Sequence, residues 1–218
     1  MTLAPETLTP ASRYSWAEIW TAVLTRPSVQ TFQEILSDPG MSRRRAYTWV
    51  VITLTVTMIF VTMVTTPDAQ TFLKTMPEAD ITLAEAQNLV VISALCSIPI
   101  ALVMGLAGFA FMVWLVQFVT KSISGSVKTD ASVKITYSFA AIQAPLNILS
   151  LLFLALPAVA LVQIVSLAAT IYQFVLMALA VRTVYELSFG RAVAVVVVTF
   201  VIIFMIVLGL VFVLGSMM

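Results

Sequence analysis

The chain has 218 residues, of which 61% are hydrophobic and 10% are charged, and its formal net charge is +1. An ordinary soluble domain is about a quarter charged, so this composition excludes a soluble globular protein and indicates an integral membrane protein. The chain has no histidine and one cysteine, which removes the usual imidazole bases and metal ligands and any internal disulfide. The small net charge, without a long basic run, argues against nucleic-acid binding.

Residues 1–45 form the first predicted unit, a cytoplasmic arm that contains an amphipathic helix. Ser15-Trp16-Ala17-Glu18 has the pattern of a capping box at the start of that helix. The following apolar residues recur at helical spacing and form one stripe, consisting of Trp16, Ile19, Trp20, Val23 and Leu24. Basic residues just before the first span, Arg43, Arg44 and Arg45, would hold anionic lipid headgroups. The stripe suits a helix in the headgroup region, and it also suits packing against the bundle or docking of a partner.

Residues 46–218 form the second predicted unit, a helical membrane domain. A transmembrane helix needs about 20 mainly apolar residues. Uncharged stretches of that length predict five spans, near 46–66, 83–120, 134–156, 158–185 and 190–217. Thr82-Leu83-Ala84-Glu85 indicates a capping box before the second span, and Leu156-Pro157 indicates a hairpin between the third and fourth. The predicted fold class is therefore an all-α membrane protein with five transmembrane helices and an N-terminal cytoplasmic amphipathic helix.

The second span carries small residues at steps of three and four, on which another helix could pack closely. They are Ala94, Ser97, Ala101, Gly105 and Gly108. The fifth span consists almost entirely of Val, Ile, Leu, Phe and Met. This composition predicts that much of its circumference contacts lipid or an apolar partner.

Spans three and four each carry uncharged polar side chains on one face. They are Gln143, Asn147 and Ser150 on the third span, and Gln163, Ser166, Thr170 and Gln173 on the fourth. An antiparallel hairpin would bring the two faces together, with Gln143 opposite Thr170. We expect this polar seam to join the helices by hydrogen bonds, because amides that face lipid are costly. A polar path or a small-molecule site is the alternative.

The basic residues predict the orientation of the chain. All Lys and Arg residues except Lys74 lie in the arm or around the loops that follow spans two and four. The positive-inside rule therefore places the N-terminus in the cytoplasm and the C-terminus on the other side. Aromatic residues fall near the predicted cytoplasmic ends, as an interfacial belt would: Tyr47, Trp49, Trp114, Tyr137 and Tyr185.

Chemistry inside the membrane is limited by the absence of charge. No carboxylate, lysine or arginine lies in the middle of a span, which counts against coupled transport and voltage sensing. The serines and threonines have no neighbouring group to activate them. We therefore predict no catalytic, metal-binding or cofactor-binding residue, no cofactor and no enzyme activity.

Several short motifs resemble those of the Yip domain family of Ypt-interacting membrane proteins. They are Trp16-x-x-Ile19, Arg26-Pro27 and Phe32 in the arm, Tyr137 and Pro145 in the third span, and Tyr185–Ala192 before the fifth. The resemblance implies a non-enzymatic five-span protein with a cytosolic N-terminus. Eukaryotic members are linked to small GTPases of the Rab/Ypt class, but the Asp-Leu-Tyr-Gly-Pro motif of their cytosolic region is missing here. No GTPase-contacting residue is therefore carried over, and the resemblance to the prokaryotic branch implies a bacterial cytoplasmic membrane.

Two functions fit these features. The leading hypothesis is a non-catalytic integral membrane protein that organises membrane or protein partners, as a small accessory or scaffold subunit of a larger membrane complex. Its partners would be membrane lipids and other integral membrane proteins. The alternative is an uncoupled carrier or channel for a small solute that uses the polar seam.

Overall fold

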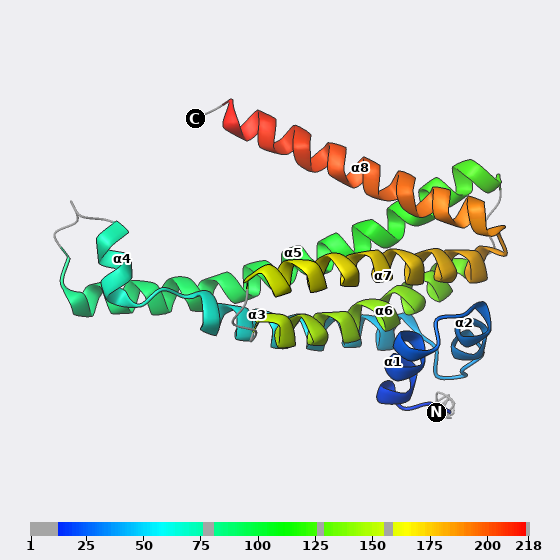
Figure 1. The fold of residues 1–218 in the computed structure, drawn as a ribbon, viewed down its shortest axis with the longest axis horizontal. Helices are drawn as coiled ribbons and strands as arrows, with labels where there is room; N and C mark the ends of the chain where they lie inside the picture. The colour runs from blue at the N-terminus through cyan, green and yellow to red at the C-terminus, as the bar shows by residue number, and fades with distance from the viewer. Residues whose placement is uncertain (1–12, 76–80, 126–128, 155–158, 217–218) are drawn as a thin grey trace, which may run out of the picture.

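The computed structural model describes residues 13–75, 81–125, 129–154 and 159–216, and these segments are largely helical. Helices α1 (Trp16–Thr25) and α2 (Val29–Leu36) belong to the arm, and α4 (Ala69–Thr75) is a short helix at the opposite end of the molecule (Figure 1). The longer helices are α3 (Arg43–Thr65), α5 (Leu83–Ser124), α6 (Ala131–Leu154), α7 (Val159–Tyr185) and α8 (Phe189–Gly215). These five helices are long and apolar enough to cross a membrane. The predicted fold class, all-α with five spans, is thus confirmed for the described part of the chain.

Local sequence signals determine where the helices begin. Ser15 caps α1 and Thr82 caps α5, and each accepts a hydrogen bond from the backbone N–H of a glutamate three residues later. The glutamate carboxylate accepts a hydrogen bond from the capping residue in return, so both predicted capping boxes are present. Serine hydroxyls also cap α2 and α3, at Ser28 and Ser42.

Some predicted boundaries differ from, or lie beyond, the described structure: α3 and α6, for example, begin at Arg43 and Ala131 rather than near residues 46 and 134. Helix α5 continues to Ser124 rather than ending near residue 120, and it stops before Gly125, whose φ of 77° is left-handed. The predicted hairpin at Leu156-Pro157 lies outside the described residues.

Helix α6 is the centre of the bundle. It packs most extensively against α3 and also contacts α7, whereas α8 packs against α7 and α5. Small side chains make this central position possible, because Ala140, Ala141 and Ala144 of α6 are all fully buried and allow neighbouring helices to approach closely.

The buried core is concentrated at the end of the bundle that carries the arm, which we call the arm end. Counted from that end, the first strongly exposed large apolar side chains are Ile52 on α3, Ile148 on α6 and Val175 on α7. The parts of these helices nearer the arm end are covered by α1, α2 and one another. Exposed apolar surface on α3, α6 and α7 therefore begins at these three positions.

Helix α8 diverges from the bundle along its length (Figure 1). Its first half buries Ala192, Val195, Val196 and Thr199, on the side where α5 and α7 contact it. Between Phe204 and Leu214, by contrast, the large apolar side chains are 44% to 77% exposed. The first half of α8 is therefore part of the core, while the second half has little protein around it.

Candidate functional site

The apolar stripe of α1 lies against the bundle. Ile19 and Val23 are 1% and 0% exposed, Trp20 and Leu24 pack against the core while half-buried, and Trp16 is 37% exposed. Helix α1 contacts α6, and α2 contacts α7 and α6. The sequence allowed the stripe to face lipid headgroups, the bundle or a partner. In the structure, the bundle covers most of it.

A buried ion pair fixes the arm to the first span. Arg45 Nη1 lies 2.8 Å from Asp38 Oδ2, and the Asp38 side chain is fully buried. The other carboxylate oxygen of Asp38 accepts hydrogen bonds from the backbone N–H groups of Arg13, at 3.0 Å, and Gly40, at 3.1 Å. Arg45 Nη2 also donates to the backbone oxygen of Tyr14 at 2.7 Å. This pair joins the loop after α2, the segment before α1 and the first turn of α3.

The three arginines before the first span therefore have different surroundings. Arg45 points into the protein, whereas Arg43 and Arg44 are exposed. Arg43 donates a hydrogen bond to the hydroxyl of Ser132 at the start of α6, at 2.7 Å. Arg43 and Arg44 are the ones whose side chains are open to a headgroup.

Three tryptophans and a tyrosine pack together beside Arg45. Trp16 and Trp20 of α1 each contact Trp49 of α3, with ring centroids 6.1 Å and 6.0 Å apart, and the Trp49 and Tyr137 centroids are 4.9 Å apart. The Arg45 guanidinium lies 5.2 Å from the centre of the Trp49 ring, a cation–π distance. Trp49 and Tyr137 are 0% exposed. The prediction that they belong to an interfacial belt is therefore wrong, because the arm covers them.

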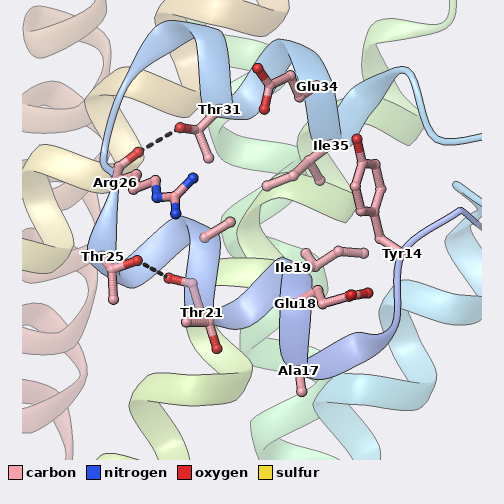
Figure 2. Close-up of a pocket in the computed structure, with 11 residues that line it drawn as sticks. Tyr14, Ala17, Glu18, Ile19, Thr21, Thr25, Arg26, Thr31, Glu34 and Ile35 are labelled. Atoms are coloured by element: carbon pink, nitrogen blue, oxygen red, sulfur yellow. Dashed lines mark hydrogen bonds between the residues drawn. The ribbon is translucent and has the colours of Figure 1, made fainter.

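A hollow of about 450 Å³ lies between α1 and α2 (Figure 2). Ile19 and Ile35 give it apolar walls, Arg26 lies at one end and Tyr14 at the other. The hydroxyl of Thr31 donates to the backbone oxygen of Arg26 at 2.6 Å and fixes the turn between the two helices.

The capping box of α1 also borders this hollow and affects a titrating group. The backbone N–H and the hydroxyl of Ser15 donate to Glu18 Oε2 at 2.7 Å and 2.9 Å. These hydrogen bonds stabilise the carboxylate and lower the pKa of Glu18 below its usual value of 4.5.

The polar seam is a chain of hydrogen bonds that crosses three helices. Gln173 Nε2 of α7 donates to Gln143 Oε1 at 3.0 Å, and Gln143 Nε2 donates to Asn147 Oδ1 at 2.9 Å. Asn147 Nδ2 then donates to the hydroxyl of Thr53 on α3 at 3.4 Å, and Thr57 of α3 donates to the Asn147 backbone oxygen at 3.3 Å. The seam thus connects α7 to α6 and α6 to α3.

The predicted partner of Gln143 was wrong by about one helical turn. Gln143 bonds to Gln173 rather than to Thr170, whose hydroxyl donates to the backbone oxygen of Ser166 in its own helix at 2.8 Å. A threonine in a helix can satisfy its hydroxyl locally in this way, whereas a glutamine amide needs another side chain. Ser150 behaves like Thr170 and donates to the Asn147 backbone oxygen at 2.6 Å.

A cavity of about 420 Å³ lies beside the seam, between α6 and α7. Seam residues line it on both helices: Gln143, Asn147 and Ser150 from α6, and Ser166, Thr170 and Gln173 from α7. Gln163 is exposed and is not part of this lining. Leu24 of the arm reaches the cavity as well, and its backbone oxygen accepts a hydrogen bond from the Tyr172 hydroxyl at 2.5 Å.

The small-residue stripe of α5 is mostly open. Ser97 and Gly108 are exposed, and Ala94, Ala101 and Gly105 are partly covered. At Gly105 a Cβ atom would lie 3.1 Å from Leu54 Cδ1 of α3, so this glycine allows close contact between the two helices. At Gly108 a Cβ atom would meet nothing within 4 Å.

Within the described segments there is no group of three or more His, Cys, Asp or Glu residues that could hold a metal ion. Sequence reasoning overlooked Asp38, Thr53, Thr57 and Tyr172, all of which contribute to the contacts above. The spacing of Thr53 and Thr57, one turn apart on α3, and the single acid just before three arginines were the available signals.

Comparison with known proteins identifies one family. The family model described as the Yip1 domain matches residues 21–211, a range that contains α2 and all five long helices except the last residues of α8. No match was found among curated proteins or among solved structures.

Proposed function

Because the chain belongs to the Yip1 domain family, with residues 21–211 matched, we propose that it is a non-catalytic integral membrane protein that organises protein partners. Its specific role would be that of a small accessory or scaffold subunit in a larger membrane complex. The observation that carries this proposal is the uncovered inner face of α8.

That face continues the buried face of the helix. Steps of four and three residues lead from the buried Thr199 through Ile203 to Ile206, Leu210 and Val213, so these side chains lie on the same side of α8. Ile206, Leu210 and Val213 are nevertheless 44%, 58% and 52% exposed. The side of α8 that contacts the bundle in the first half of the helix is therefore uncovered in the second half, where α8 diverges from the bundle (Figure 1).

A transmembrane helix of another protein is the occupant that fits this space. The second half of α8 contains no charged or amide side chain, which matches an apolar helix. Helix association in a membrane depends on close van der Waals packing rather than on the hydrophobic effect. A partner helix inserted beside Leu210 would add such packing on two sides, from α8 and from the bundle.

Site-specific photo-crosslinking tests the proposal. A photoreactive amino acid at Leu210 is expected to give one cross-linked protein of defined mass in the native membrane. The same residue at Leu95 of α5, which is 64% exposed, is the matched control and should label lipid. Lipid adducts alone at Leu210, or the same products at both positions, would contradict the proposal.

We further propose that the polar seam acts as an attachment between helices and not as a solute path. The support is that its amides are hydrogen-bonded to one another from α7 through to α3. Proteoliposomes provide the test, since a solute flux that disappears in Gln143→Leu while the protein stays folded would favour a carrier or channel.

A further inference from the structure

We infer that the cavity between α6 and α7 binds the headgroup of an uncharged, hydroxyl-bearing lipid of the diacylglycerol class. This inference is independent of the proposed role of α8. It rests on the charge of the cavity lining, the unused hydrogen-bonding groups in that lining and the exposed apolar surface next to the cavity.

The cavity lies within the membrane-spanning parts of α6 and α7 and opens beside exposed apolar side chains. Its lining on α6 includes Asn147 and Ser150, on either side of Ile148, where strong apolar exposure begins on that helix. Its lining on α7 ends at Gln173, close to Val175, where exposure begins on that helix. A lipid whose polar group enters the cavity therefore does not need to move its acyl chains away from the hydrocarbon.

The lining excludes charged headgroups. It contains amide, hydroxyl and aliphatic side chains and a single aromatic residue, Tyr172, but no Lys, Arg, Asp or Glu. A phosphate held away from water needs charged or convergent N–H donors, and a cationic headgroup needs a carboxylate or an aromatic cage. A neutral group with hydroxyls meets neither difficulty.

Hydrogen-bonding capacity remains inside the cavity. Among the described residues, neither the Ser166 hydroxyl nor Gln173 Oε1 has a hydrogen-bond partner in another side chain or backbone group. Each glutamine amide in the seam also uses only one of its two N–H groups. Such groups are expensive to leave unsatisfied in the membrane-spanning part of a protein. A ligand hydroxyl both donates and accepts, so it can complement an oxygen and an N–H at once.

Apolar side chains flank the cavity where acyl chains would lie. Ile148 and Leu152 on α6 are 39% and 62% exposed, and Leu167 and Ile171 on α7 are 63% and 58% exposed. They are one or two positions away from lining residues and point from other, exposed faces of the same helices. At the arm end, Leu24 and the Tyr172 hydrogen bond to its backbone close the cavity.

The test uses the full-length protein in nanodiscs with a diacylglycerol that carries a photoreactive diazirine in one acyl chain. We expect saturable labelling of peptides from α6 and α7 that excess unlabelled diacylglycerol removes. Ala169→Phe fills the cavity from its α7 wall and should lower labelling by about tenfold or more. Ile164→Phe places a phenyl ring on the same helix, at a position that is 67% exposed and outside the lining, and should leave labelling unchanged.

Two further experiments test the same proposal independently. Ser166→Ala with Thr170→Val removes hydroxyls without adding volume, and it should lower labelling several-fold even if Ala169→Phe fails to fold. A phosphatidylglycerol with the same photoreactive chain should label weakly. Equal labelling by the two lipids, equal labelling of the Ala169→Phe and Ile164→Phe proteins, or no saturable labelling at all would overturn the inference.

Discussion

Asp38 and Arg45 form a 2.8 Å ion pair in which the aspartate side chain is fully buried and the arginine side chain is 12% exposed. The pair connects the end of the arm to the first turn of α3, and Arg45 continues from it to the rings of Trp49 and Tyr137. The position of the arm against the bundle therefore depends on a charge pair as well as on apolar contacts.

Removing the aspartate should release the arm. In Asp38→Ala, Arg45 is left largely buried without its carboxylate, and such a loss costs about 3–5 kcal/mol. We expect a lower melting temperature in detergent and faster proteolysis at Arg26. The double variant Asp38→Ala with Arg45→Met should recover much of the loss, because it removes the uncompensated charge. An Asp38→Ala variant with the same melting temperature as the native protein would contradict the role given to this pair.

Trp49 should matter far more for stability than Trp114. Trp49→Ala leaves a cavity beneath both arm tryptophans, and truncation of a buried aromatic side chain costs about 3–5 kcal/mol. Trp114 is 56% exposed, so Trp114→Ala should change the unfolding free energy by about 0.5 kcal/mol or less. Denaturant unfolding followed by near-ultraviolet circular dichroism measures both. Similar losses in the two variants would show that the arm does not cover Trp49.

The amides of the seam should be energetically coupled. Gln143→Leu and Gln173→Leu each leave the other amide without its partner, at a cost of about 0.6 kcal/mol and at most about 1.7 kcal/mol. In the double variant both amides are absent. The stability losses of the two single variants should therefore add up to more than the stability loss of the double variant. Melting temperatures of the four proteins in one detergent give this comparison, and strictly additive losses would argue against the hydrogen bond.

The start of α1 should weaken in acid. The folded pKa of Glu18 is lowered by its hydrogen bonds to Ser15, so the unfolded state binds more protons as the pH falls. The stabilisation is complete above the unfolded pKa, near 4.5, and is lost as the pH falls through the lower folded pKa. Fluorescence of the arm tryptophans between pH 7 and pH 3 should show this transition. Glu18→Gln should remove it, and an unchanged transition in that variant would assign it to another group.

The five spans and both capping boxes could be predicted because they depend on local features. Runs without charge define the spans, and Ser15 and Thr82 bond to glutamates three residues away. The contacts of Arg45 could not be predicted in the same way, since topology alone already accounts for basic residues before a span. Trp49 and Tyr137 occur at positions where either an interfacial belt or a covered core fits the sequence, and only the position of the arm distinguishes the two.

The seam shows how far helical spacing determines contacts. Spacing identified the polar faces of α6 and α7, yet the bonded pair is Gln143 with Gln173 because long amide side chains reach across a turn. The contribution of α3 through Thr53 depends on which helix packs beside α6, and neither composition nor spacing in the sequence specifies that neighbour.

Gentle extraction of the native membrane, followed by sizing and mass spectrometry of everything that migrates with this chain, tests the central proposal most directly. We predict migration in fixed stoichiometry with a larger membrane assembly, and loss of that migration when Leu210 and Ile206 on the open face of α8 are both changed to tryptophan. The matched control changes Leu95 and Met104 on α5, which are 64% and 67% exposed, and it should still migrate with the assembly. A chain that migrates alone, near 23.7 kDa plus bound detergent, would contradict the proposal that it is an accessory subunit.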